Sequence, residues 1–334
     1  MVNKFIQFFI IAIISFIISE IVLRLHDYQP FILTSYSIES TPESCIIPDS
    51  TLGFALNAGQ YIVTINDKVK YTCTHTENRI TTFIENSITP MMPTVDIHGC
   101  SFTYGMGVDD SLNYPYLVQQ AMPTTKINNH ACPGYGTIQA LLKLQKAIID
   151  KKIPKVCIIN YAQFHDERNV LSNNFRLGLK TGFENSSKEI KPLFENSRIP
   201  YYSDGTIQYK QWNDLYHHWY LRTNSSVINA LQIVAERFRE YPETHRTTTF
   251  LIFKAIQKLC LENNIQLGIA IITKHPKNFE IIDFCKKENI PVLDMALDLP
   301  SEQYSHIPYD IHPNEKAHQY FAKKLTPFIH RLLE

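Results

Sequence analysis

The 334-residue sequence lacks an excess of charge of either sign, because 32 lysines and arginines stand against 32 aspartates and glutamates. A nucleic-acid-binding surface requires clustered basic side chains, so this balance argues against nucleic acid as a partner. The chain also lacks internal repeats and low-complexity tracts. Its 44% apolar and 19% charged residues are ordinary globular values. The length allows one large domain with additions or two smaller domains.

The sequence also lacks cysteines and histidines at the spacing of metal ligands. The seven cysteines are odd in number and show neither Cys-x-x-Cys nor His-rich spacing, which argues against a zinc site and against a full disulfide framework. We therefore expect no metal and no cofactor. Cys100 and Cys132 lie within two of the motifs discussed below, and spacing alone leaves open whether they form a disulfide. The cysteines are Cys45, Cys73, Cys100, Cys132, Cys157, Cys260 and Cys285.

One long apolar run stands at the N-terminus. From Phe5 to Leu23 it reads FIQFFIIAIISFIISEIVL, close to the roughly 20 helical residues that cross a bilayer core. Glu20 and Arg24 lie near its far end, where charged groups reach the membrane interface. No A-x-A-like cleavage site follows the run, which favours a transmembrane anchor over residues 5–24 rather than a cleaved signal peptide or a core helix.

The orientation of this anchor is weakly encoded. Lys4 and the amino terminus lie on one side of the run, and Arg24 and His26 lie on the other. Counting charges therefore barely decides which side faces the cytoplasm.

Two segments with different patterns follow the anchor. Residues 27–93 are rich in Thr, Ser, Pro and Asn, with short strand-like runs at Gln60–Ile65 and Val69–His75, which predicts a stalk and a small β-rich arm. Residues 94–334 alternate short apolar runs with helical stretches, which predicts a parallel sheet covered on both faces. We expect strands at 94–99, 124–130, 155–162, 266–273 and 291–296, and helices at 111–122, 137–150, 248–263, 279–288 and 315–333.

A long stretch at about 163–245 interrupts this alternation. It is dense in Asn, Arg and Tyr and contains both tryptophans, Trp212 and Trp219, so we expect an irregular functional insertion rather than a connector. Aromatic residues beside polar ones suit recognition of sugars or lipid head groups. An insertion that packs a small core of its own explains them equally well.

Ser101 is the candidate nucleophile. It follows a predicted strand and a glycine, at the edge where an open α/β sheet binds its ligands. A serine hydroxyl needs a base within hydrogen-bond reach and donors for the oxyanion. His312 precedes Pro313, which favours an extended backbone, and in such a segment Asp310 and His312 point to the same side. A carboxylate in this place orients the imidazole toward the serine.

Other histidines are rival bases near the C-terminus. His318 and His330 lie in the predicted terminal helix, and His306 lacks the Asp and Pro-Asn context of His312. The sequence therefore favours His312.

With four motif blocks in order, residues 94–334 resemble the SGNH/GDSL family of hydrolases. The first block, GCSFTYG (99–105), implies Ser101 as nucleophile and its backbone N–H as an oxyanion donor, with Cys100 where the family usually has Asp. The second, NHACPGYGT (129–137), implies the backbone N–H of Gly134 as another donor, although a simple strand-to-helix turn also explains this glycine.

The third and fourth blocks depart from the family pattern. In AQFHDERN (162–169), His165 stands where the family has the Asn that donates to the oxyanion, and Asp166 keeps the Asp. An imidazole N–H can fill such a role. In YDIHPN, the resemblance implies Asp310 and His312 as the orienting carboxylate and the base, spaced Asp-x-His rather than Asp-x-x-His. Anchored members also resemble this chain upstream, in an apolar helix that ends like Glu20 to Leu25.

The resemblance implies a flavodoxin-like three-layer α/β/α fold and a serine esterase held in a membrane by one helix. It also implies an extracytoplasmic, periplasmic catalytic domain, and substrates among O-acetyl groups of envelope carbohydrate or lipid esters. Two alternatives stay open. The same Ser-His-Asp triad serves an acyltransferase, and the missing Asn of the third block also fits a catalytically silent scaffold or glycan-binding protein.

Overall fold

The computed structural model describes residues 2–32, 36–82, 92–184, 191–240 and 242–334. Its centre is a five-stranded sheet in the order β12-β11-β8-β6-β7, and every pairing within it is parallel. The five strands are β6 (Thr94–His98), β7 (Lys126–Asn129), β8 (Val156–Tyr161), β11 (Gln266–Thr273) and β12 (Val292–Leu297). The five strands expected from the apolar runs are thus confirmed.

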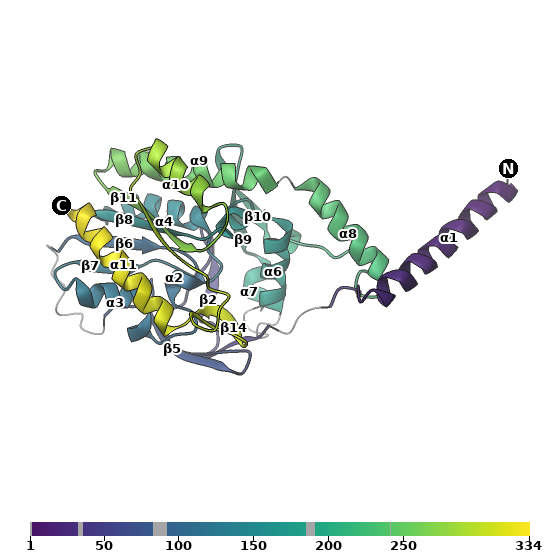
Figure 1. Cartoon of the computed structure of the whole chain (residues 1–334), viewed down its shortest axis with the longest axis horizontal. Helices are drawn as coiled ribbons and strands as arrows, with labels where there is room; N and C mark the ends of the chain where they lie inside the picture. Colours follow the sequence, from purple (N-terminus) through teal and green to yellow (C-terminus); the bar gives the residue numbers. More distant parts are fainter. Residues whose placement is uncertain (1, 33–35, 83–91, 185–190, 241) are drawn as a thin grey trace. The chain divides into compact units, whose positions relative to one another are not determined.

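Helices cover both faces of this sheet and confirm the three-layer α/β/α architecture (Figure 1). Alternate strand residues enter opposite cores: Ile97 and Ile158 pack in one, and Cys157 and Ile159 pack in the other. The first core receives α3 (Tyr114–Ala121) and α11 (Glu315–Leu333), and the second receives α4 (Thr137–Ile149), α9 (Pro242–Glu262) and α10 (Asn278–Lys287).

Antiparallel strands precede the parallel sheet, as expected. They are β1 (Ile38–Thr41), β4 (Gly59–Ile65) and β5 (Val69–His75) in one sheet and the hairpin β2 (Ile46–Asp49) with β3 (Gly53–Leu56). Alternation along β5 buries Val69, Tyr71, Cys73 and His75, the pattern of a strand with one face on a core. This third core also contains Tyr104 and other residues near Ser101, so the β-rich arm supports the candidate site.

The stretch at 163–245 contains regular elements, unlike the irregular segment that the sequence suggests. Residues 173–184 and 226–239 do carry apolar residues at helical spacing, a signal that the many polar and aromatic residues of this stretch obscure. The rings of Phe183, Phe194 and Trp212 contact one another, and this part packs on the same third core as the β-rich arm rather than on a core of its own. The elements are α5 (His165–Asn169), α6 (Asn173–Glu184), α7 (Lys191–Glu195), β9 (Arg198–Ser203), β10 (Thr206–Gln211), the 3₁₀ helix η3 (Trp212–Asp214) and α8 (Ser226–Arg239).

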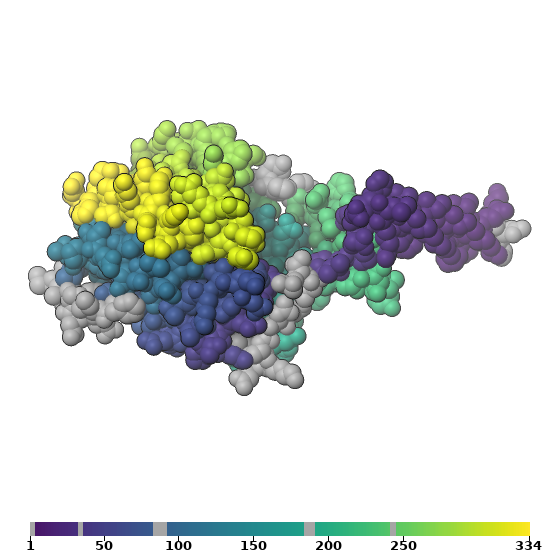
Figure 2. All heavy atoms as spheres, turned by 60° about the horizontal axis from the view of Figure 1, so that its bottom comes forward, coloured from purple at the N-terminus to yellow at the C-terminus, as the bar shows by residue number. Residues whose placement is uncertain are grey.

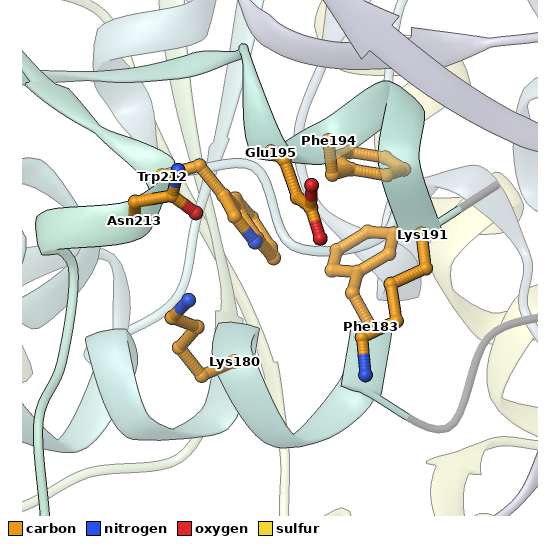
Figure 3. Close-up of a pocket in the computed structure, with 7 residues that line it drawn as sticks. All are labelled: Lys180, Phe183, Lys191, Phe194, Glu195, Trp212 and Asn213. Atoms are coloured by element: carbon orange, nitrogen blue, oxygen red, sulfur yellow. The ribbon is translucent and has the colours of Figure 1, made fainter.

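A pocket opens beside these rings, lined by aromatic side chains together with two lysines and a carboxylate (Figure 3). None of its lining residues is a candidate site residue from the sequence. They are Lys180, Phe183, Lys191, Phe194, Glu195, Trp212 and Asn213.

The chain divides into two compact units. One contains Met1–Ser35 and Tyr216–Pro242, and the other contains Tyr36–Leu215 and Glu243–Glu334. The smaller unit begins with α1 (Val2–Leu25), whose residues Lys4–Leu25 are long and apolar enough to cross a membrane, with a mean hydropathy of 2.5 over an 18-residue window. Its side chains are uncovered along the helix (Figure 2).

Candidate active site

Ser101 begins a single-turn helix, α2 (Ser101–Tyr104), directly after strand β6 and the turn Gly99-Cys100. Gly105 ends this helix at a φ of 91°, and a Cβ there would lie 2.5 Å from the Cβ of Asn113, so the turn requires glycine. In the described part of the chain, the backbone N–H of Ser101 donates no hydrogen bond. Ser101 therefore combines a side-chain hydroxyl with a backbone N–H that has no acceptor among the described residues, and it lies at the carboxyl end of the central strand β6.

His312 and Asp310 form a hydrogen-bonded pair on β14 (Asp310–Pro313). His312 Nδ1 lies 2.8 Å and 3.0 Å from the two carboxylate oxygens. The Tyr36 hydroxyl donates to Asp310 Oδ1 at 2.9 Å. Burial alone would raise the pKa of Asp310, but the hydrogen bond and charge of His312, together with Tyr36, hold it below its ordinary value. An ionised carboxylate thus fixes the imidazole with Nε2 free of this pair.

Phe102, the residue after Ser101, links the motif blocks. Its ring meets the His312 ring edge-on at 5.4 Å between centroids, and it meets Phe164 edge-on at 5.4 Å. The Phe164 ring in turn contacts the ring of its neighbour His165, with 5.2 Å between the ring centroids. The structure therefore gathers residues of the first, third and fourth blocks around one side chain.

The second block also reaches this place. The backbone N–H of Cys132 donates to the Gly99 carbonyl at 3.4 Å, and Arg168 Nη1 donates to the Tyr135 carbonyl at 2.8 Å. Between them Gly134 has a φ of 87°, and a Cβ on it would lie 2.9 Å from the Phe54 ring. Both the backbone angle and this close approach exclude larger residues. Among the described residues, the N–H of Gly134 has no hydrogen-bond acceptor.

His165 is 1% exposed, at the start of α5, and neither of its ring nitrogens has a partner in the described part of the chain. Burial holds its pKa well below the ordinary value, and the charge of Arg168 adds to this effect, so the imidazole is neutral near pH 7. A neutral imidazole carries one N–H donor. The same lack of partners holds for His98, so this property alone does not distinguish His165.

Asp166 has a structural role that the motif comparison left open. Its carboxylate accepts hydrogen bonds from Tyr161 Oη at 2.9 Å and Thr249 Oγ1 at 2.7 Å, and it forms an ion pair with Arg246 at 2.6 Å. These contacts tie α5 to β8 and α9. Asp166 thereby fixes the place of its neighbour His165.

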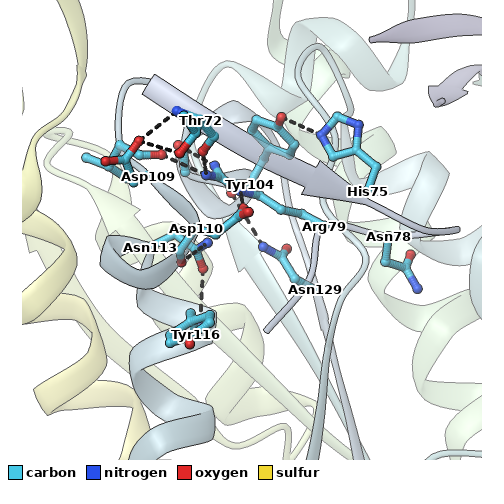
Figure 4. A network of polar contacts seen from close by, with 12 residues as sticks. Thr72, His75, Asn78, Arg79, Tyr104, Asp109, Asp110, Asn113, Tyr116 and Asn129 are labelled. Carbon is cyan, nitrogen blue, oxygen red and sulfur yellow. Dashed lines mark hydrogen bonds and ion pairs between the residues drawn. The ribbon is translucent and has the colours of Figure 1, made fainter. Parts of the chain in front are cut away.

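Arg79 is a supporting residue that the sequence analysis missed (Figure 4). It is fully buried, pairs with Asp110 at 2.7 Å, and donates to the carbonyls of Tyr104, Gly105 and Val108 at 3.0, 2.6 and 2.7 Å. Its guanidinium also lies over the Tyr104 ring at 4.7 Å. Arg79 therefore holds the segment that follows Ser101, and we name it a positioning residue.

The rival histidines differ from His312 in their contacts, although His306, on β13 (Ser305–His306), is the cross-strand partner of Asp310 on β14. His318 is buried and its Nδ1 accepts the backbone N–H of Tyr114 at 3.2 Å, which is a structural contact. Burial lowers the pKa of His306, and His330 is exposed on α11. Cys100 and Cys132 are free thiols, so the disulfide left open above is absent. In the described residues no group of three or more His, Cys, Asp or Glu side chains is placed to hold a metal ion.

No protein-family model and no curated protein match this chain. Solved structures similar to it include TesA, at 12% identity and a TM-score of 0.41, covering 72% of this chain and 99% of that one. Another is the psychrotrophic esterase EstA from Pseudoalteromonas sp., at 13% identity and a TM-score of 0.40, covering 72% and 98%. A carbohydrate esterase matches at 11% identity and a TM-score of 0.38, covering 74% and 68%.

Proposed function

We propose that this chain is a membrane-anchored serine esterase with Ser101 as nucleophile, His312 as general base and Asp310 as the carboxylate that orients it. One observation carries the proposal. The Asp310-paired imidazole of His312 packs on the side chain next to Ser101, and the N–H of Ser101 and that of Gly134 are free within the described chain. Nucleophile, oriented base and unused donors are the parts that acyl transfer requires.

In this mechanism Ser101 Oγ attacks the ester carbonyl while His312 Nε2 takes the hydroxyl proton. The carbonyl oxygen becomes an oxyanion, which the N–H groups of Ser101 and Gly134 and the imidazole N–H of His165 stabilise. Collapse of the intermediate expels the alcohol, which receives the proton from His312. Water then attacks the acyl-serine while His312 takes its proton, and the acyl–Oγ bond breaks as His312 returns the proton to Ser101, which releases the carboxylic acid.

The proposed substrates are O-acetyl groups of envelope carbohydrate or lipid esters on the extracytoplasmic side of a membrane. An apolar helix at the N-terminus supports this setting, because it would keep the domain close to such molecules. The test uses the full chain in detergent, with p-nitrophenyl esters of increasing acyl length and an O-acetylated oligosaccharide. We expect ester cleavage that saturates with substrate. Absence of cleavage across this panel would favour the silent scaffold.

His165→Ala is expected to lower kcat by about 10²–10³, because one oxyanion donor is lost while nucleophile and base remain. His165→Asn should recover part of this loss, since its amide N–H reaches a similar place. Initial rates measured over a range of concentrations of the best ester give kcat and KM and check the prediction. A His165→Ala enzyme with wild-type kcat would leave the oxyanion to the two backbone amides.

The full-length protein is expected to stay in the membrane fraction after high-salt and alkaline washing, with its uncleaved mass. Peripheral proteins leave under these conditions, whereas a helix with roughly 20 apolar residues across the bilayer core does not. Fractionation followed by intact mass spectrometry measures this. A soluble form that lacks about the first 25 residues would show a signal peptide instead.

A further inference from the structure

Helix α8 turns its polar side chains inward, toward its own unit. Asn229 Oδ1 accepts from Arg222 Nε at 2.9 Å, and Gln232 Oε1 accepts the Trp219 backbone N–H at 2.9 Å. One turn further along, Glu236 Oε1 accepts from the Tyr216 hydroxyl at 2.7 Å. The loop at 216–222 thus takes up the polar face of the helix through hydrogen bonds.

The opposite side of α8 is apolar and exposed. Leu231, Val234 and Phe238 follow one another at spacings of three and four residues, which places them in one stripe, and Phe238 is 78% exposed. A helix on the surface of a soluble protein shows the reverse arrangement, with its apolar stripe on the core. The loop before α8 adds exposed Trp219, Tyr220 and Leu221. The Leu221 carbonyl accepts the N–H groups of Asn224 and Ser225, so this loop lies at the start of α8. Large exposed apolar side chains gathered in so small a unit mark an interaction surface.

The beginning of α8 is fastened to the end of α1 within the same unit (Figure 1). The Glu20 carboxylate accepts the backbone N–H groups of Ser226 and Val227 at 3.0 Å each and the Ser225 hydroxyl at 2.7 Å. Arg24 pairs with Glu20 at 2.7 Å and donates to the Asn224 carbonyl at 2.8 Å. The last two turns of the apolar helix therefore serve as the N-terminal cap of α8.

We propose that the apolar face of α8 (Leu231, Val234 and Phe238), together with Trp219, Tyr220 and Leu221, lies in the head-group region of the bilayer that α1 crosses. The proposal rests on α1 as a membrane anchor. The last turns of a membrane-spanning helix lie at the interface, and Glu20 and Arg24 fix the start of α8 at that level.

The composition of this surface suits lipid rather than protein. Tryptophan and tyrosine concentrate at membrane interfaces, where ring and polar tip meet apolar and wet surroundings. Arg237 and Arg239 in the last turn of α8 supply cations for anionic head groups. Apolar residues on one side, polar residues on the other and arginines at one end are typical of a helix that lies in the plane of a membrane.

Tryptophan fluorescence in vesicles containing brominated phospholipids tests the proposal, because the chain has two tryptophans. In full-length Trp212→Phe, Trp219 is the sole emitter, and bromine high on the acyl chains should cause a large loss of its fluorescence. The matched control is Trp219→Phe, in which emission comes from Trp212, 5% exposed and packed on Phe183 and Phe194. Its emission should not change with bromination.

Single tryptophans introduced at positions 238 and 16 test the α8 surface and the α1 anchor separately. With both native tryptophans replaced by phenylalanine, Phe238→Trp should be quenched by shallow bromine and Phe16→Trp in α1 by bromine deep in the acyl chains. Quenching at position 16 without quenching at 219 and 238 would overturn the α8 proposal and leave the anchor intact. Blue-shifted emission at 238 without quenching would show that a second copy of the chain covers this face, and it would overturn the proposal. Absence of quenching at all three positions would contradict both anchor and surface.

Discussion

Ser101→Ala is expected to remove ester hydrolysis almost completely, with kcat falling on the order of 10⁶-fold, as when a triad nucleophile is deleted. The fold should survive, because no hydrogen bond of the Ser101 hydroxyl holds the described structure together, and the stability cost should be about 1 kcal/mol or less. Steady-state kinetics and urea unfolding measure the two effects. Ser111→Ala, at an exposed serine in η2 (Asp110–Leu112), is the matched control and should match wild type in both.

A double variant sharpens this expectation. Members of a triad act as one unit, so Ser101→Ala with His312→Ala should be no slower than either single variant. Additive losses would show that the two residues act in separate steps, which contradicts the proposed proton transfer between them.

Arg79→Leu is expected to lower the free energy of unfolding by about 3–5 kcal/mol, because it leaves the buried Asp110 carboxylate without its counterion. Three carbonyls of the segment 104–108 also lose their donor, so this segment and the Ser101 helix before it should loosen. Urea unfolding of the full chain in detergent measures the loss.

The matched control for this variant is Lys146→Ala, which breaks the exposed pair of Lys146 with Asp150 at 2.7 Å. Surface pairs contribute about 0–1 kcal/mol, so this variant should unfold close to wild type. Replacing Asp110 by Leu in the Arg79→Leu background should recover part of the loss, since the unpaired buried carboxylate is then absent. A loss for Arg79→Leu as small as that of the control would contradict the role of Arg79 as a positioning residue.

The sheet and the pair on β14 could be predicted because local pattern determines them. Buried parallel strands are short apolar runs, and these stand out between helical stretches. Asp310 and His312 share one side of an extended segment, which is a consequence of strand geometry, and the structure pairs them at 2.8 Å.

Contacts between distant segments could not be predicted in this way. Arg79 donates to backbone carbonyls about 25–29 residues later in the chain. Because every residue has a backbone carbonyl, no residue pattern in the sequence indicates these contacts. Tyr36 reaches Asp310 across 274 positions. The inverted polarity of α8 also emerges only once its inward partners, such as Arg222 and Tyr216, are known.

Labelling of the full-length wild-type protein with a fluorophosphonate probe, followed by mapping of the modified peptide, tests the central claim most directly. The probe bonds covalently to a serine whose hydroxyl is activated by a neighbouring base and whose oxyanion donors are in place. The account predicts one adduct, on Ser101, that disappears in Ser101→Ala and weakens strongly in His312→Ala. An adduct on another serine, or labelling of Ser101 that is unchanged by His312→Ala, would contradict it.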